Sequence, residues 1–200
     1  MALLFAKNNS LSAVTSLPAS VSGGALNLLS TQTASSSATI DFTSGIDSTY
    51  KVYMFKYYNI HPATDNVKFN VNFRDGDTNF DAVKQTSAFY AYNNETSGDT
   101  TLSYSAGGDL VNSTSAHSLV LSMGNDADEC CSGSLFLFNP SSTTFVTQFF
   151  SQTSSYSYQN YTYDWKTAGY CNTTSAIDGV QFSMSSGNID SGTIKLYGVS

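Results

Sequence analysis

Apolar and polar residues alternate with a period of two along parts of this chain. The clearest case is the segment 67–74, which reads VKFNVNFR and carries an apolar side chain at every odd position. Successive side chains of a β-strand point to opposite faces, so this alternation predicts a half-buried strand. The segment 50–58 is more continuously apolar and aromatic, which predicts a central strand.

Other short segments of β-type residues are separated by turn signals such as Asp75-Gly76, Asn139-Pro140 and Asp178-Gly179. No segment shows sustained 3.6-residue periodicity, so long helices are not expected. Eight to ten strands at this spacing predict an all-β fold, a two-sheet antiparallel β-sandwich that is jelly-roll-like. The remaining expected strands are 38–42, 88–92, 101–104, 118–122, 134–138, 144–150, 180–184 and 193–197.

The first 34 residues differ from the rest of the chain. They are mostly small and aliphatic, and no aromatic residue follows Phe5 in this region. We therefore predict an extended N-terminal arm at 1–34 and one β-sandwich domain at 35–200. Such an arm would pack along its own sheet or lie across a neighbouring subunit. The apolar run at its start is too short for a signal peptide, and no stretch has the roughly 18 apolar residues of a membrane helix.

Charge narrows the range of partners. Only 12% of the 200 residues are charged, and the formal net charge is −7 with eight Lys and Arg residues. Phosphate backbones and anionic membranes require clustered basic residues, so neither nucleic acid nor membrane insertion is expected. Aromatic residues make up 14% of the chain and supply apolar area for a core.

Catalytic equipment is scarce, and we expect neither an enzyme nor a cofactor. The two histidines have no identifiable partners, since His61 precedes Pro62 in an expected turn and His117 precedes a strand. No G-x-S-x-G motif is present, and nothing in the sequence pairs two carboxylates for glycoside hydrolysis.

The three cysteines favour reduced thiols made in a cytosol. Cys130 and Cys131 are adjacent and Cys171 stands alone, so at most one of the pair could form a disulfide with Cys171. Extracellular disulfide scaffolds normally carry an even, spaced set.

One acidic loop offers candidate calcium ligands. Its oxygen-bearing side chains alternate, as ligands do in a calcium loop. The match to an EF-hand then fails, because Phe80 stands where glycine is needed and Thr86 where a bidentate glutamate is needed. An ordinary acidic turn after the strand 67–74 is the alternative. The candidate ligands are Asp75, Asp77, Asn79 and Asp81.

A tyrosine-rich stretch is the candidate recognition or contact surface. Aromatic rings stack on sugars and anchor protein partners at low entropic cost. The same residues would otherwise cover the edge of the sandwich or fill a subunit contact. The residues concerned are Tyr156, Tyr158, Tyr161, Tyr163 and Trp165.

Four stretches resemble small virion structural proteins of marine tailed phages, cyanophage- and pelagiphage-like podoviruses among them. The likeness covers roughly residues 30 to 200 and consists of strand-and-turn patterns, with no catalytic or ligand residues to carry over. The stretches are Ser36–Tyr50, Asn59–Asn66, Leu135–Phe145 and Thr174–Gly198.

The resemblance implies a non-enzymatic virion protein made in the bacterial host cytoplasm. We expect it to decorate or cement the capsid exterior, anchored through the N-terminal arm. The alternatives are a tail or head fibre or other appendage component, or a carbohydrate-binding module for host-surface attachment. The implied partners are the major capsid protein or tail proteins, further copies of the chain in a homo-oligomer, and a host-surface glycan.

Overall fold

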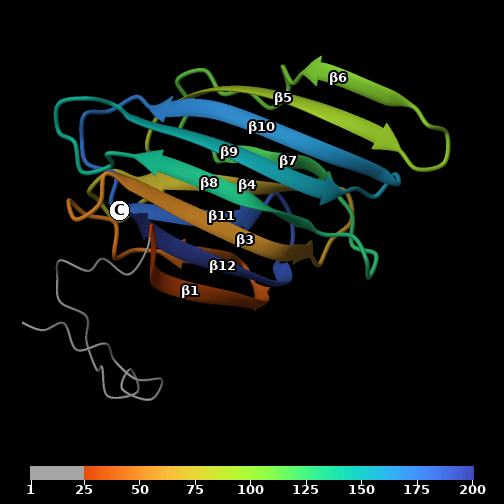
Figure 1. Cartoon of the computed structure of the whole chain (residues 1–200), viewed down its shortest axis with the longest axis horizontal. Coiled ribbons are helices and arrows are strands. Elements are labelled where there is room, and N and C mark those ends of the chain that lie inside the picture. Colours follow the sequence, from red (N-terminus) through yellow and green to blue (C-terminus); the bar gives the residue numbers. More distant parts are fainter. Residues whose placement is uncertain (1–24) are drawn as a thin grey trace, which may run out of the picture.

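The computed structural model describes residues 25–200, and within them the chain forms twelve strands and no helix (Figure 1). No helix in this part of the chain is therefore long and apolar enough to cross a membrane. The strands are β1 (Leu26–Ser37), β2 (Thr39–Phe42), β3 (Val52–Pro62), β4 (Val67–Arg74), β5 (Lys84–Asn94), β6 (Thr100–Tyr104), β7 (His117–Met123), β8 (Cys131–Phe138), β9 (Thr147–Tyr156), β10 (Tyr161–Cys171), β11 (Gly179–Met184) and β12 (Ile189–Val199).

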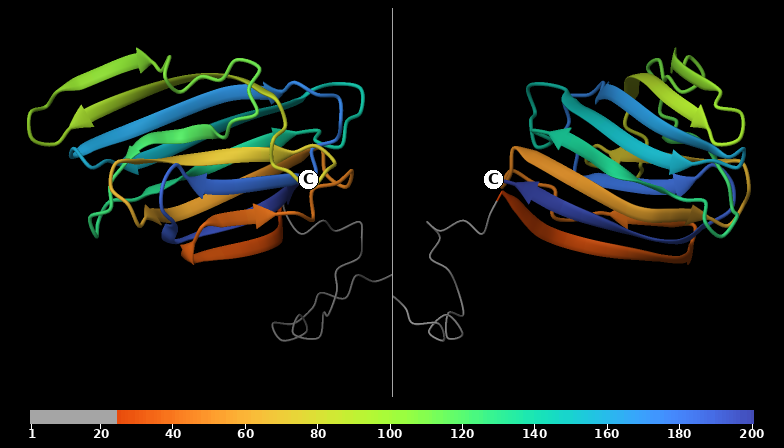
Figure 2. Two further views of the ribbon diagram at one scale, coloured as in Figure 1. Left: turned by 180° about the vertical axis from the view of Figure 1, so that it is seen from behind. Right: turned by 45° about the vertical axis from the view of Figure 1, so that its right-hand side comes forward.

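The strands form two antiparallel sheets packed face to face. The larger sheet has eight strands in the order β1-β12-β3-β8-β9-β10-β5-β6, and the smaller has four in the order β2-β11-β4-β7. Figure 1 shows the larger sheet in front, and the left view of Figure 2 shows the smaller sheet in front. The predicted all-β fold of two antiparallel sheets is confirmed.

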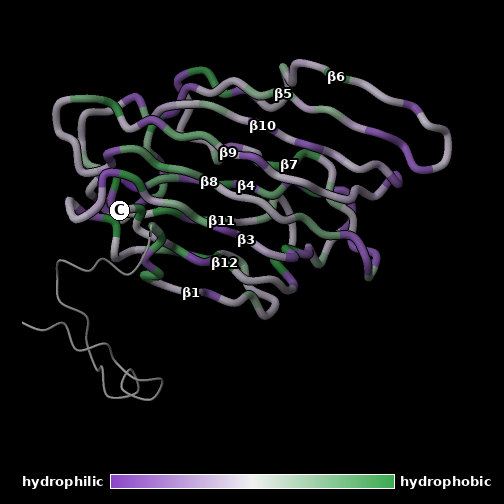
Figure 3. The backbone as a smooth tube through the Cα atoms, in the orientation of Figure 1, coloured by the Kyte–Doolittle hydropathy of each residue, from purple (hydrophilic) through white to green (hydrophobic). Residues whose placement is uncertain are grey.

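The core lies between the sheets and is rich in aromatic rings. Phe182 of β11 lies within 6.3 Å, centroid to centroid, of rings from β2, β3 and β4, and it is stacked on Phe69 at 5.7 Å. Edge-to-face and offset ring pairs add stabilisation beyond their buried area. Hydrophobic (green) and hydrophilic (purple) stretches are interspersed along the strands in Figure 3. The segment 67–74 forms strand β4 as expected, and its Phe69, Val71 and Phe73 are fully buried. The strand is more than half-buried, because Asn70 and Asn72 on the opposite face are buried as well.

Gly133 of β8 makes room for one of these core rings. A Cβ atom at this position would lie 2.8 Å from Cε2 of Tyr57 and 2.3 Å from the backbone oxygen of Gln152. The Tyr57 ring is fully buried, and its hydroxyl is hydrogen-bonded to Thr153 of β9. A strand glycine here therefore follows from the close approach of a ring and a neighbouring backbone.

The structure places residues 26–34, the last part of the expected arm, in strand β1. This strand pairs with β12 from Leu26 opposite Val199 to Ser37 opposite Ile189. It forms one edge of the larger sheet, so for these residues the arm packs along its own sheet. The rest of the expected arm, residues 1–24, lies outside the described residues.

Two strands were not among those expected from the sequence. One is β1, and the other is β10, which pairs with β9 on one side and β5 on the other. The tyrosine-rich stretch from Tyr156 to Trp165 covers the last residue of β9, a turn and the first half of β10. It is therefore largely part of the sheet.

Candidate binding surface

The tyrosine-rich stretch is divided between the two faces of the larger sheet. Tyr161, Tyr163 and Trp165 alternate along β10 and share a face with the buried Thr167, which is the inner face. Tyr156 ends β9 in register with Thr162 on the outer face, and its hydroxyl donates to Oδ1 of Asn160 at 2.9 Å. Tyr158 lies in the turn between the two strands. The structure thus brings together three of the five expected residues.

The three inner residues form a tyrosine cluster with two tyrosines that the sequence analysis did not single out. Tyr90 and Tyr92 of β5 face Trp165 and Tyr163 in the β10 register. The ring centroids of Tyr90 and Trp165 lie 4.6 Å apart, and those of Tyr92 and Tyr161 lie 4.8 Å apart. The tyrosine cluster is therefore Tyr90, Tyr92, Tyr161, Tyr163 and Trp165.

Rings in the tyrosine cluster mainly cover one another. Trp165 is 4% exposed, and its indole Nε1 has no hydrogen-bond partner among the described residues. Burial raises the pKa of Tyr163 to about 12. The smaller sheet ends at β7, which packs against β9 and β10. The cluster thus extends the aromatic core toward β5 and leaves only part of each tyrosine ring accessible, so it offers little ring face to a ligand.

The outer face of the larger sheet presents more accessible rings. Phe150 of β9 is 41% exposed and Phe89 of β5 is 44% exposed. Phe150 stacks on Phe136 of β8 at 4.7 Å between centroids, with an interplanar angle of 22°. No other element of the described chain forms a layer over this face (Figure 1).

A depression of about 240 Å³ opens on this face between β5, β9 and β10. We call it the outer cleft. It contains exposed rings at two strands and polar side chains between them, in contrast to the self-covered tyrosine cluster. Its lining side chains on the outer face are Ser87, Phe89, Phe150, Gln152, Lys166 and Ala168.

An acidic side chain on β10 organises the polar part of the outer cleft. Oδ1 of Asp164 accepts a hydrogen bond from Nε2 of Gln152 at 3.1 Å. Its Oδ2 lies 3.5 Å from Nζ of Lys166. All three groups are accessible, so they can exchange these contacts for hydrogen bonds to hydroxyl groups of a ligand. The charge of Lys166 is balanced locally by Asp164.

Two further lysines lie on the same face. The register places Lys195, Lys56, Ser134, Gln152, Lys166 and Phe89 in one cross-strand row from β12 to β5. Lys56 and Lys195 stand directly opposite one another, and neither forms an ion pair with any acidic residue in the described range 25–200. Like charges opposite one another in a sheet are destabilising. The positive charge at the β3–β12 end of the row is therefore not balanced by a paired acidic residue of the described chain.

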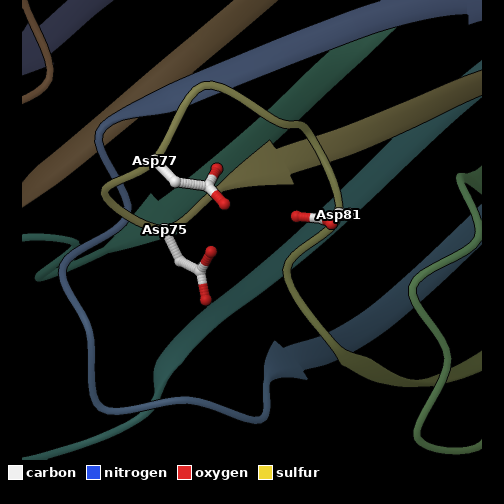
Figure 4. A group of neighbouring side chains, drawn as sticks. All are labelled: Asp75, Asp77 and Asp81. Carbon is white, nitrogen blue, oxygen red and sulfur yellow. The ribbon is translucent and has the colours of Figure 1, made fainter.

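The acidic loop after β4 brings three of its four candidate calcium ligands together (Figure 4). Carboxylate oxygens of Asp75, Asp77 and Asp81 all lie within 4.8 Å of one another. Asn79 instead donates to Asp77, from its backbone N–H at 2.6 Å and from its side-chain nitrogen at 3.4 Å. Calcium takes six to eight oxygen ligands, more than three monodentate carboxylates supply. The contacts of Asn79 are those of an acidic turn.

Two buried polar residues between the sheets, Lys84 and His117, are hydrogen-bonded within the protein interior. Nζ of Lys84, a fully buried residue, donates to Asn72 and to the backbone oxygens of Ala82 and Thr114. Burial lowers its pKa to about 8. His117 is also fully buried, its Nε2 lies 3.1 Å from the hydroxyl of Thr167, and burial lowers its pKa to about 4. Neither side chain is accessible to a substrate.

All three cysteines are free thiols. Cys131 and Cys171 are buried, whereas Cys130 is half-buried. Burial raises the pKa of Cys171 to about 12 and that of Cys131 well above its ordinary value. The structure therefore agrees with the expectation of reduced thiols, and the environment of the two buried cysteines disfavours the nucleophilic thiolate.

Sequence reasoning missed the outer cleft, although its residues lie in segments that were expected as strands. The doublet Phe149-Phe150 was a signal, because adjacent strand residues point to opposite faces and only one of the two can enter the core. Comparison with known proteins found no relative: no family model, no curated protein and no solved structure matches the chain.

Proposed function

We propose that the protein is a non-enzymatic virion structural protein that decorates or cements the exterior of a phage capsid. The observation that carries this proposal is the outer face of the larger sheet. It presents accessible aromatic rings at Phe89 and Phe150, and no described element covers it. Accessible aromatic groups in a hollow of a rigid sheet serve a binding or assembly role. The resemblance to small phage virion proteins supplies the setting.

We also propose that the two sheets form a jelly-roll-like sandwich, and the strand order supports this. Strands β1 to β5 pass alternately between the larger and the smaller sheet, and β11 and β12 do so again at the other end of the chain. Strands from the two ends thus lie side by side in both sheets. Jelly rolls occur in viral capsid proteins and in lectins.

In this proposal the residues before β1 anchor the protein to the shell or to a sister copy. The structure sharpens the test, because Leu26 already pairs with β12 and should be kept. Deletion of residues 2–24 should abolish association with particles while leaving the described strands intact. Unchanged incorporation of the truncated protein would contradict the anchoring role.

Copy number tests the place of the protein in the virion. Quantitative densitometry of purified particles should give hundreds of copies for a capsid decoration protein. A dozen or so copies would favour the alternative, a tail or head fibre component. Absence of the protein from purified particles would overturn the virion proposal.

A further inference from the structure

We propose that the outer cleft, together with Lys56 and Lys195, binds an acidic polysaccharide. The inference deepens the proposed function, and it rests on that function only for where the ligand is met, on the surface of a host cell. The binding surface differs from the tyrosine-rich stretch that the sequence singled out.

The rings of the outer cleft suit a sugar. Phe150 is held in place by stacking on Phe136 at 4.7 Å and on Phe138 at 5.6 Å between centroids. Its ring therefore needs little further ordering when a ligand arrives, which lowers the entropic cost of binding. Gln152 and Lys166 line the cleft together with the ring, and Asp164 contacts both of them. The amide, ammonium and carboxylate groups of these three residues can donate to and accept from sugar hydroxyls.

The lysines call for a negative group on that sugar. Lys56 and Lys195 face each other without an acidic partner among the described residues, in a protein whose formal net charge is −7. An anion placed between two ammonium groups removes their repulsion and adds two charge-assisted hydrogen bonds. A carboxylate or sulfate carried by a sugar ring has this chemistry.

The length of the row points to a polymer. From Lys195 on β12 to Phe89 on β5 the row crosses six neighbouring strands. With adjacent strands about 4.8 Å apart, it spans roughly 24 Å. A monosaccharide fills one end of such a row, whereas a chain of several sugars places its acidic groups at the lysines and a ring on Phe150 at the same time.

Two other occupants fit less well. A second copy that docked the same face in a two-fold dimer would set lysine-bearing rows against each other. A single-stranded nucleic acid carries a charge on every phosphate, and binding it requires a basic groove along the strand. Here the formal net charge of the chain is −7, and Lys166 in the cleft is already paired with Asp164.

The test is an array of bacterial and algal polysaccharides, neutral, uronic-acid-containing and sulfated, probed with the full-length protein. We expect binding to acidic polysaccharides that weakens as salt is raised. Phe150→Ala and the double change Lys56→Gln with Lys195→Gln should each reduce affinity at least tenfold. The matched controls are Lys68→Gln, which removes a charge from an exposed position of β4, and Tyr161→Ala in the tyrosine cluster.

Each outcome decides the proposal. Loss of binding in the cleft and lysine variants alone, with thermal unfolding unchanged, supports it. The proposal is overturned if the protein binds no acidic polysaccharide. It is also overturned if Tyr161→Ala or Lys68→Gln loses as much binding as the cleft and lysine variants. Binding to a single-stranded oligonucleotide, or dimerisation lost with Phe150→Ala, would assign the face to another partner. These outcomes leave the virion proposal standing, because particle copy number tests it separately.

Discussion

Lys56 and Lys195 stand opposite one another across strands β3 and β12, with no acidic side chain of the described residues paired to either. The repulsion between the two ammonium groups should lower the stability of the fold, and a single substitution can measure this effect. Lys195→Glu would replace the repulsion with a cross-strand ion pair. We expect the free energy of unfolding to rise by about 0.2–1 kcal/mol in urea denaturation. The same variant should lose the acidic polysaccharide. An unchanged or lower stability would show that the two ammonium groups do not repel each other.

Gly133 should tolerate no side chain. A Cβ atom there would meet the Tyr57 ring and the backbone of Gln152, neither of which can move without disturbing the core. Gly133→Ala should therefore destabilise the protein by about 1–3 kcal/mol in chemical denaturation, which is the usual cost of overpacking. As a reference, Gly107→Ala places a Cβ atom in open space and should change stability by no more than about 0.5 kcal/mol. Equal effects of the two variants would contradict the close approach.

His117 should make the fold sensitive to acid. Its folded pKa of about 4 lies below the ordinary value of 6.5, so the unfolded chain binds a proton first as the pH falls. Stability is therefore complete above pH 6.5 and is lost on the way down to pH 4. The loss from this residue is about 2–3 kcal/mol between pH 7 and pH 4.5.

The variant that isolates this effect is His117→Gln, which can still hydrogen-bond to Thr167 but does not titrate. Denaturation curves at pH 7, 5.5 and 4.5 should show a smaller decline for the variant than for the parent protein. Parallel declines would mean that the acid sensitivity comes from carboxylates alone.

The three thiols should differ in reactivity. Cys130 is half-buried, whereas Cys131 and Cys171 are enclosed and have raised pKa values. Iodoacetamide at neutral pH should therefore label at most one site in the folded protein and three after denaturation, as counted by mass spectrometry. Cys130→Ser should remove the label from the folded state. Rapid labelling of three sites without denaturant would argue against the enclosed positions of Cys131 and Cys171.

The hydrogen bonds of Lys84 should contribute to the free energy of unfolding. Its ammonium group supplies donors to Asn72 and to the backbone oxygens of Ala82 and Thr114. Lys84→Met would leave the backbone oxygen of Ala82 without its donor, whereas Thr114 and Asn72 keep donors from Asn72 Nδ2 and the Phe73 N–H. We expect a cost of about 1–3 kcal/mol in the free energy of unfolding. The exposed Lys68→Met on β4 should be nearly neutral in the same urea titration. A stable Lys84→Met protein would mean that water replaces the ammonium group.

The sequence predicts a strand most directly where apolar and polar residues alternate without a break. In β4 the alternation of apolar and polar residues is complete, so both the strand and its buried face could be predicted. In β1 the residues are mainly small hydroxyl and exposed aliphatic ones, because an edge strand buries little. Its pairing with β12 joins segments at opposite ends of the chain, and no local pattern reports such a partner.

The candidate site was harder to predict for a related reason. The tyrosine-rich stretch is conspicuous in the sequence. The strand pleat nevertheless places its side chains on two faces of the larger sheet and buries its tryptophan. The outer cleft combines Phe89, Phe150 and Lys166 from three strands, and only the register of β5, β9 and β10 makes them neighbours. Composition correctly indicated an aromatic core, but it carries no information on register.

The pairing of late strands with early ones also constrains how the protein is made. Among the strands of residues 25–200, β1 pairs with β12 alone and β2 pairs with β11 alone. While the chain is being synthesised, both early strands leave the ribosome long before their partners exist. Each then has free backbone donors and acceptors that a neighbouring nascent chain could pair with. Both sheets close only when the final two strands insert, so translation rate and chaperone access should govern the yield of folded protein.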